Sequence, residues 1–161
     1  MDDIFYMEKA LALAKQAAQE GEVPVGCVIV RNGQIVALGR NCRETQKSAL
    51  GHAEIQAIDA ACKALGGWRL WDCTLYVTLE PCSMCAGAII NARIPRVVFG
   101  ARDEKYGACG SVCNLFSMNF NHKPQVTAGV LESESKALME DFFRQLRVTL
   151  RDRPKWHKTT T

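Results

Sequence analysis

Two short segments, His52-Ala53-Glu54 and Pro81-Cys82-Ser83-Met84-Cys85, constrain the fold most, because together they supply three ligands for one metal ion. One imidazole and two thiolates match the ligand set of a zinc ion whose fourth position is open to water. Glu54 is then a spare carboxylate that can take a proton from that water and return it to a leaving group. The chain must fold so that the two segments meet, and the pattern indicates a hydrolytic zinc enzyme.

The spacing within each segment predicts how the ligands sit on helices. Cys82 and Cys85 are three residues apart, so they share a face of a helix. Pro81 suits the first turn of that helix, where its missing N–H is tolerated. A helix N-terminus also favours the thiolate, which is the form that binds metal. His52 and Glu54 reach one pocket only if both lie at a helix start, with His52 in the entering turn.

Other interpretations of these residues remain open. A Cys-x-x-Cys pair is also typical of structural zinc sites and redox-active dithiols, and in a structural site Glu54 would be the fourth ligand. His122 is an alternative ligand, although nothing places it nearer to the cysteine pair than His52. Cys109 and Cys113 could form half of a second metal site, but no His or Cys pair lies near them in the sequence. The upstream His-x-Glu favours a catalytic zinc ion.

Length and composition indicate one domain over residues 1–161, because 161 residues with 48% hydrophobic content can bury one good core. No stretch approaches the roughly 20 apolar residues of a membrane span. The N-terminal Met1-Asp2-Asp3-Ile4 lacks the basic-then-apolar pattern of a secretory signal. Together with eight cysteines, this leads us to expect a reducing compartment, the cytoplasm.

The charge is concentrated at the C-terminal end. Residues 144–161 carry six Lys or Arg and one Asp, whereas residues 1–143 carry 14 basic and 16 acidic side chains. A basic helix and tail, over about residues 134–161, on a nearly neutral body suggests a polyanionic partner, although basic tails are often only solvated.

The order of the predicted elements indicates a three-layer α/β/α sandwich around a five-stranded sheet. The first helix covers residues 3–20, with Ile4, Met7, Leu11 and Ala14 on one stripe, capped by Asp2 or Asp3. Asn32-Gly33 predicts a hairpin between strands 25–30 and 34–38, followed by a polar loop over 41–51. The remaining predicted elements are helices over 52–65, 83–92 and 134–151, strands over 74–79, 96–100 and 126–130, and a mostly irregular segment over 101–124.

Several segments resemble the bacterial tRNA-specific adenosine deaminases of the cytidine deaminase-like superfamily, whose fold is an α/β/α sandwich with a mixed sheet. The similarity extends over nearly the whole chain. It is carried by Gly21-Glu22-Val23-Pro24-Val25-Gly26, Arg40-Asn41, His52-Ala53-Glu54, Trp68-Arg69-Leu70, Thr78-Leu79-Glu80-Pro81-Cys82-Ser83-Met84-Cys85, Ala101-Arg102-Asp103, Asn121-His122 and Phe142-Phe143-Arg144.

This resemblance implies a role for each matching residue. His52, Cys82 and Cys85 would bind one zinc ion per subunit, and Glu54 would be the catalytic acid and base. The substrate-binding residues would be Asn41, Asp103, His122, Phe143 and Arg144. Phe142 and Phe143 are adjacent, so one is expected to pack in the core while the other faces out. The family also implies a homodimer.

The implied reaction is hydrolytic deamination of adenosine to inosine at the wobble position of a tRNA anticodon, so the expected partner is a tRNA anticodon stem-loop. The alternative is a deaminase acting on free guanine, cytosine or cytidine with the same zinc chemistry. A third possibility is a silent RNA-binding subunit with a structural zinc ion, against which the intact Glu54 argues.

Overall fold

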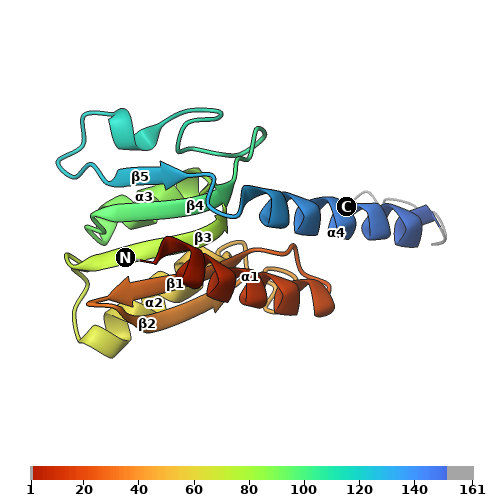
Figure 1. Ribbon diagram of the computed structural model, residues 1–161, viewed down its shortest axis with the longest axis horizontal. Helices are drawn as coiled ribbons and strands as arrows, with labels where there is room; N and C mark the ends of the chain where they lie inside the picture. The colour runs from red at the N-terminus through yellow and green to blue at the C-terminus, as the bar shows by residue number, and fades with distance from the viewer. Residues whose placement is uncertain (1, 152–161) are drawn as a thin grey trace, which may run out of the picture.

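The computed structural model describes residues 2–151, and the chain folds around one mixed five-stranded sheet (Figure 1). The strands lie in the order β2-β1-β3-β4-β5. β1 is antiparallel to both β2 and β3, whereas β3, β4 and β5 are parallel. The elements, in chain order, are α1 Asp3–Gln19, β1 Gly26–Arg31, β2 Gln34–Arg40, α2 Ala53–Leu65, β3 Cys73–Leu79, α3 Ser83–Asn91, β4 Arg96–Ala101, a 3-10 turn Leu115–Ser117, β5 Gln125–Ala128 and α4 Glu132–Arg151.

The two faces of the sheet carry separate apolar clusters. Cys27 and Ile29 of β1 pack with α2 and α3, whereas the alternating Val28 and Val30 pack with α1. A strand covered on both faces is buried and mainly apolar along nearly its whole length, as β1 and β3 are. Figure 1 shows α1 on one face of the sheet and α2 and α3 on the other, which confirms the three layers.

The Asn32-Gly33 turn forms the predicted hairpin. Asn32 and Gly33 both adopt positive φ angles, 51° and 76°, as a type I′ turn requires. β1 and β2 pair through it with a register shift after Ile29. The predicted hairpin is therefore confirmed. It could be predicted because the two turn residues themselves favour this turn type.

The buried stripe of α1 differs in part from the prediction. Asp2 caps the helix and accepts the N–H of Phe5, while Met7, Leu11 and Ala14 are buried as expected. Ile4, however, is 55% exposed, so its assignment to the stripe was wrong. The helix face on the sheet is rich in alanine and lies so close to β1 that a Cβ at Gly26 would collide with the backbone of α1. Ile4 lies outside the part of α1 that packs closely on β1, so its side chain stays exposed.

The start of α3 also differs from the prediction. Cys82 is the N-cap residue and Ser83 the first helical residue, so Pro81 precedes the helix instead of lying in its first turn. The extended φ and ψ of Cys82, −73° and 177°, direct the chain from β3 into the helix. Cys82 and Cys85 therefore meet as N-cap and third helical residue.

α4 begins at Glu132, two residues earlier than predicted, and extends beyond the sheet (Figure 1). Its one buried residue is Ser135. The basic residues Arg153, Lys155 and Lys158 lie outside the described residues. None of the helices described between residues 2 and 151 is long and apolar enough to cross a membrane.

Candidate metal centre and substrate pocket

Two helix starts meet at the candidate metal centre. His52 is the N-cap residue of α2 and Glu54 its second residue, as the spacing predicted. α2 lies so close to β2 that a Cβ at Gly39 would collide with the carbonyl oxygen of Ala53. Glycine at position 39 thus allows the first turn of α2 to pack directly on the sheet. Cys82 lies in the short connection between β3 and α3.

The three predicted ligands lie at distances that suit one zinc ion. His52 Nδ1 is 3.5 Å from Cys82 Sγ and 3.5 Å from Cys85 Sγ, and the three ligand atoms lie within 4.8 Å of one another. Tetrahedral zinc with ordinary Zn–N and Zn–S bonds would separate nitrogen from sulfur by about 3.6 Å. The donor set and its spacing therefore fit zinc. Among the described residues, neither His122, Cys109 nor Cys113 belongs to a metal-ligating cluster.

The two cysteine ligands differ in their pKa values. Hydrogen bonds from the Cys85 thiol and from His52 lower the pKa of Cys82 to about 4. Donation to the Cys82 thiolate and burial raise the pKa of Cys85 far above its ordinary value. The hydrogen bond to Cys82 also raises the pKa of His52. These contacts thus favour the thiolate form of Cys82, whereas the Cys85 thiol holds its proton more tightly and must lose it to bind metal.

Glu54 lies beside the ligands but is not one of the three clustered ligand residues. It is 4% exposed, and burial together with the Cys82 thiolate raises its pKa to about 7. A carboxyl group with a pKa near neutrality can both accept and donate a proton at the working pH. This position suits an acid and base better than a fourth structural ligand.

The centre opens into a cavity of about 1230 Å³. His52, Glu54 and Cys82 form its floor. Its walls come from the loop after β2, the loop after β4 and one face of α4. Four of the five predicted substrate-binding residues line these walls: Asn41, Asp103, Phe143 and Arg144.

The structure does not bring His122 into this cavity. The His122 ring contacts the carbonyl oxygen of Ile94, with Nε2 at 2.6 Å. Ile94 follows the C-terminal end of α3, whereas the metal ligands lie at its N-terminal end. Within one chain, His122 is therefore remote from the metal centre.

Phe142 and Phe143 do not divide between core and surface as expected. Phe143 is 37% exposed and lines the cavity, while Phe142 is half-buried and belongs to neither core cluster. Their rings meet edge to face with centroids 5.3 Å apart. The expectation of a core phenylalanine was wrong because this part of α4 lies beyond the sheet.

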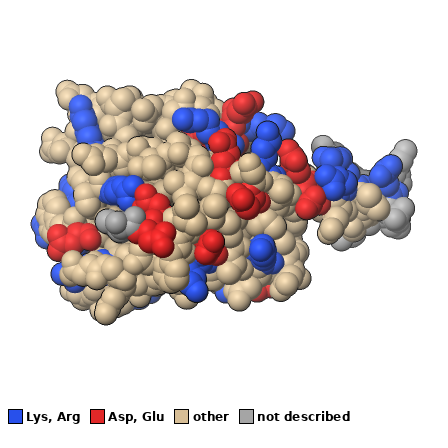
Figure 2. Space-filling model, in the orientation of Figure 1, with Lys and Arg blue, Asp and Glu red and all other residues tan. Residues whose placement is uncertain are grey.

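Sequence reasoning missed most of the cations around the cavity. Arg43, Arg102, Lys105, Lys136 and Arg147 line it together with Arg144. Figure 2 shows Lys and Arg side chains gathered on the outer half of α4, with Asp and Glu near its junction with the body. The signals available were the position of Arg43 two residues after Asn41 and that of Arg102 directly before Asp103.

A buried carboxylate at the cavity, that of Glu80, was also missed as a site residue. Glu80 is 2% exposed and lines the cavity two residues before Cys82. Burial would raise its pKa, but hydrogen bonds from Ser111 and from backbone N–H groups hold the pKa below its ordinary value. It joins the metal-binding segment to the loop after β4.

Several known deaminases are similar to this chain. The sequence model of the MafB19-like deaminases matches residues 1–147. A tRNA-specific adenosine deaminase of Bacillus subtilis is 52% identical over 146 residues, which are 90% of this chain and 91% of that protein.

Two solved structures are also informative. One, from a study of A-to-I editing by tRNA:A34 deaminases at the wobble position of transfer RNA, has a TM-score of 0.81 and 45% identity, covering 83% of this chain and 98% of that chain. A guanine deaminase of Bacillus subtilis has a TM-score of 0.63 and 29% identity, covering 98% of this chain and 99% of that chain.

Proposed function

The chain belongs to the MafB19-like deaminase family, and we propose that it is a tRNA-specific adenosine deaminase that converts the wobble adenosine of an anticodon to inosine. One observation carries the proposal: Glu54 stands beside a His-Cys-Cys ligand set at a large cavity that six Lys or Arg side chains line together with, besides Glu54, four Asp or Glu side chains. The ligand set and the carboxylate supply the hydrolytic chemistry, and the walls suit a polyanion.

His52, Cys82 and Cys85 would hold one zinc ion. When bound, the ion supplies Lewis-acid activation of the water that replaces the amino group. His52 presents Nδ1 to the two sulfur atoms. The low pKa of Cys82 favours the thiolate form of that ligand, which is the form that binds metal.

Glu54 moves the protons. Its carboxylate takes a proton from the attacking water and delivers it to the adenine ring nitrogen. It then takes the proton of the new C6 hydroxyl group and delivers it to the amino group, which departs as ammonia. Overall, one water is consumed and one ammonia released as adenosine becomes inosine. The raised pKa of Glu54 suits both directions of transfer.

The cavity walls would hold a nucleotide taken out of its stack. Asn41 is 7% exposed and lines the cavity, and its amide would contact the flipped nucleoside. Asp103 on the opposite loop would contact a neighbouring nucleotide. Phe143 offers a ring for stacking and Arg144 a cation for phosphate.

We propose a homodimer in the cytoplasm as the working form. His122 supports the dimer, because its ring lies outside the cavity of its own chain and would contact substrate only at the site of a second subunit. In a dimer that builds each site from two subunits, His122 would contact RNA bound mainly by the other subunit.

The alternative substrate is a free base or nucleoside, as in the guanine deaminase to which the chain is similar. The size and charge of the cavity argue against it. A volume of about 1230 Å³ exceeds the range typical of small-molecule pockets. A free base also offers no phosphate for the six Lys and Arg side chains, which line the cavity among five Asp and Glu side chains.

Inosine formation on an anticodon stem-loop with adenosine at the wobble position tests the proposal. Free adenosine, cytidine and guanine are assayed in parallel with the same zinc-loaded protein. We expect conversion of the stem-loop alone. Conversion of a free base or nucleoside instead would move the protein to nucleobase salvage, and binding without turnover would support a silent RNA-binding subunit.

A further inference from the structure

We infer that Glu80 is a positioning residue that fixes Asp103 in the cavity wall and thereby sets the affinity for substrate. The inference rests on the proposed function, because the substrate that Asp103 would contact is an anticodon nucleotide. Glu80 acts through the loop after β4 and not on the reacting atoms.

The carboxylate of Glu80 accepts four hydrogen bonds from one loop. Oε1 accepts the Asp103 N–H at 3.2 Å and the Ser111 hydroxyl at 2.5 Å. Oε2 accepts the N–H groups of Cys109 and Ser111, each at 3.1 Å. Among the described residues no Lys or Arg forms an ion pair with Glu80, so these loop groups stabilise its buried charge.

These bonds tie the loop after β4, at Asp103, Cys109 and Ser111, to Glu80, which lies between β3 and the ligand Cys82. Asp103 Oδ1 in turn accepts the N–H groups of Lys105 and Tyr106, each at 3.1 Å. The residues 102–106 held in this way all line the cavity. A displacement of Asp103 would therefore move the wall while leaving the metal ligands in place.

The loop is wrapped closely around the carboxylate. Gly107 N–H donates to the Asp103 carbonyl oxygen at 2.8 Å. A Cβ at Gly107 would collide with Glu80 Oε2 and with that same carbonyl oxygen. Glycine at position 107 is thus required for the contact between Glu80 and the loop.

Glu80→Gln should release one of the four bonds selectively. If the amide nitrogen replaced Oε2, it would face two N–H donors, from Cys109 and Ser111. If it replaces Oε1, the Ser111 hydroxyl can turn to accept from it, and only the Asp103 N–H loses its acceptor. The second arrangement leaves fewer unsatisfied donors, so the substitution frees Asp103 in particular.

Glu22 offers a matched control. Its carboxylate is equally buried, at 0% exposure, and accepts only backbone N–H groups: Oε1 takes those of Glu44 at 2.8 Å and Thr45 at 3.0 Å, and Oε2 shares that of Glu44. In Glu22→Gln the carbonyl oxygen can keep both donors. The same chemical change should therefore leave the stem-loop kinetics unaltered.

The experiment compares wild type, Glu80→Gln and Glu22→Gln by residue-resolved amide hydrogen exchange, zinc content and stem-loop kinetics. In Glu80→Gln we expect the Asp103 amide to exchange at least about tenfold faster, with Cys109 and Ser111 still protected, and KM to rise about tenfold. Its kcat and zinc content should stay within about twofold of wild type. Glu22→Gln should match wild type throughout.

Gly107→Ala keeps the test decisive where Glu80→Gln does not fold, because it disturbs the same contact without removing the charge. It should also expose the Asp103 amide and raise KM. Unchanged Asp103 exchange in a folded variant, or a fall in kcat with loss of zinc, would overturn the inference. The exchange measurements need no RNA. They therefore show whether Glu80 holds the Asp103 amide even if the wild-type protein forms no inosine and the proposed function fails.

Discussion

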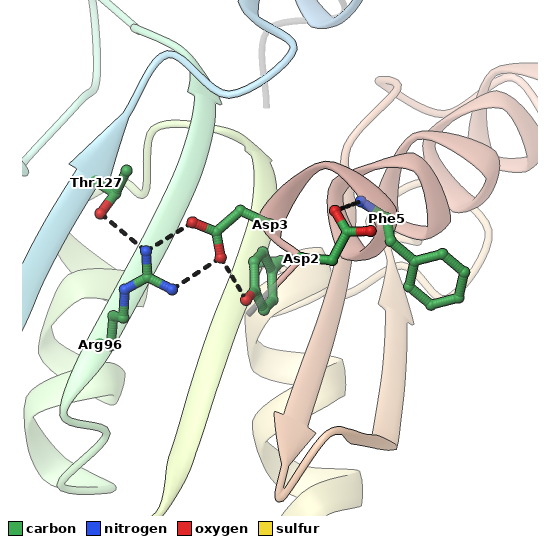
Figure 3. Close-up of polar contacts among 6 residues, drawn as sticks. Asp2, Asp3, Phe5, Arg96 and Thr127 are labelled. Carbon is green, nitrogen blue, oxygen red and sulfur yellow. Dashed lines mark hydrogen bonds and ion pairs between the residues drawn. The ribbon is translucent and has the colours of Figure 1, made fainter.

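Asp3 on α1 and Arg96 at the start of β4 form a two-pronged ion pair, with oxygen–nitrogen distances of 2.8 and 2.7 Å (Figure 3). The Tyr76 hydroxyl donates to Asp3 Oδ1 at 2.7 Å, and Arg96 also donates to Thr127 at 3.1 Å. The network joins α1 to three neighbouring strands. It lies at the start of β4, whereas the metal site lies beyond the end of β3, so it stabilises the sheet without touching the chemistry.

Replacing Arg96 with Met should lower the free energy of unfolding by about 3 kcal/mol, because it leaves Asp3 largely buried without its charged partner. Chemical denaturation of the zinc-loaded protein measures the change. Asp59→Asn breaks the exposed Asp59–Lys63 pair and serves as the control, with no measurable change expected. Equal losses in the two variants would contradict the special role of this partly buried pair.

The same pair predicts a pH dependence of stability. The hydrogen bond from Arg96 lowers the pKa of Asp3 below its ordinary value of 3.8. The carboxylate therefore contributes stability above pH 3.8, and this contribution is lost as the pH falls through the lower, folded-state pKa. In Asp3→Asn the free energy of unfolding should fall less steeply over this acidic range. Parallel curves for the two proteins would show that the pair does not carry the effect.

Glu54→Gln should keep the fold and the zinc content while reducing turnover of the stem-loop by at least about 10²-fold, since it removes the proton acceptor. Zinc analysis and single-turnover kinetics separate the two effects. Loss of zinc in this variant would make Glu54 a ligand. Glu54→Ala should behave in the same way.

Zinc binding at pH 7 should release about one proton from Cys85, with a further fraction from His52, and none from Cys82, because the pKa of Cys82 is already about 4. Calorimetry of metal-free protein in buffers of different ionisation enthalpy gives the number. Cys85→Ser should bind zinc more weakly and release fewer protons. Equal release by wild type and this variant would contradict the assignment.

Arg147→Ala should weaken stem-loop binding and reduce the slope of log affinity against log salt by about one, as expected when one phosphate contact is lost. The measurement is titration of a labelled stem-loop at several salt concentrations. Lys63→Ala removes an equal charge from α2, outside the cavity, and should leave the slope unchanged. An unchanged slope for Arg147→Ala would place RNA elsewhere.

Local patterns predicted most elements because each is specified by a few neighbouring residues. Asn32-Gly33 selects its turn, Gly66 ends α2 with a φ of 72°, and the spacing of His52 and Glu54 requires a helix start. Ile4 and Phe142 were misplaced because their burial depends on how closely α1 meets the sheet and where α4 leaves it. The periodicity of apolar residues within a helix contains no information about how closely that helix packs on the sheet or how far it extends beyond it.

By itself, the sequence determined the candidate metal ligands, the spare carboxylate and the order of helices and strands, because these follow from residue chemistry and short spacings. Tertiary structure alone decided which distant residues share one environment. Arg96 meets Asp3 across 93 positions, Ser111 meets Glu80 across 31, and His122 is kept out of the cavity. Such contacts depend on strand order and loop path, and buried charges make them specific because a carboxylate removed from water must find donors wherever the fold places them.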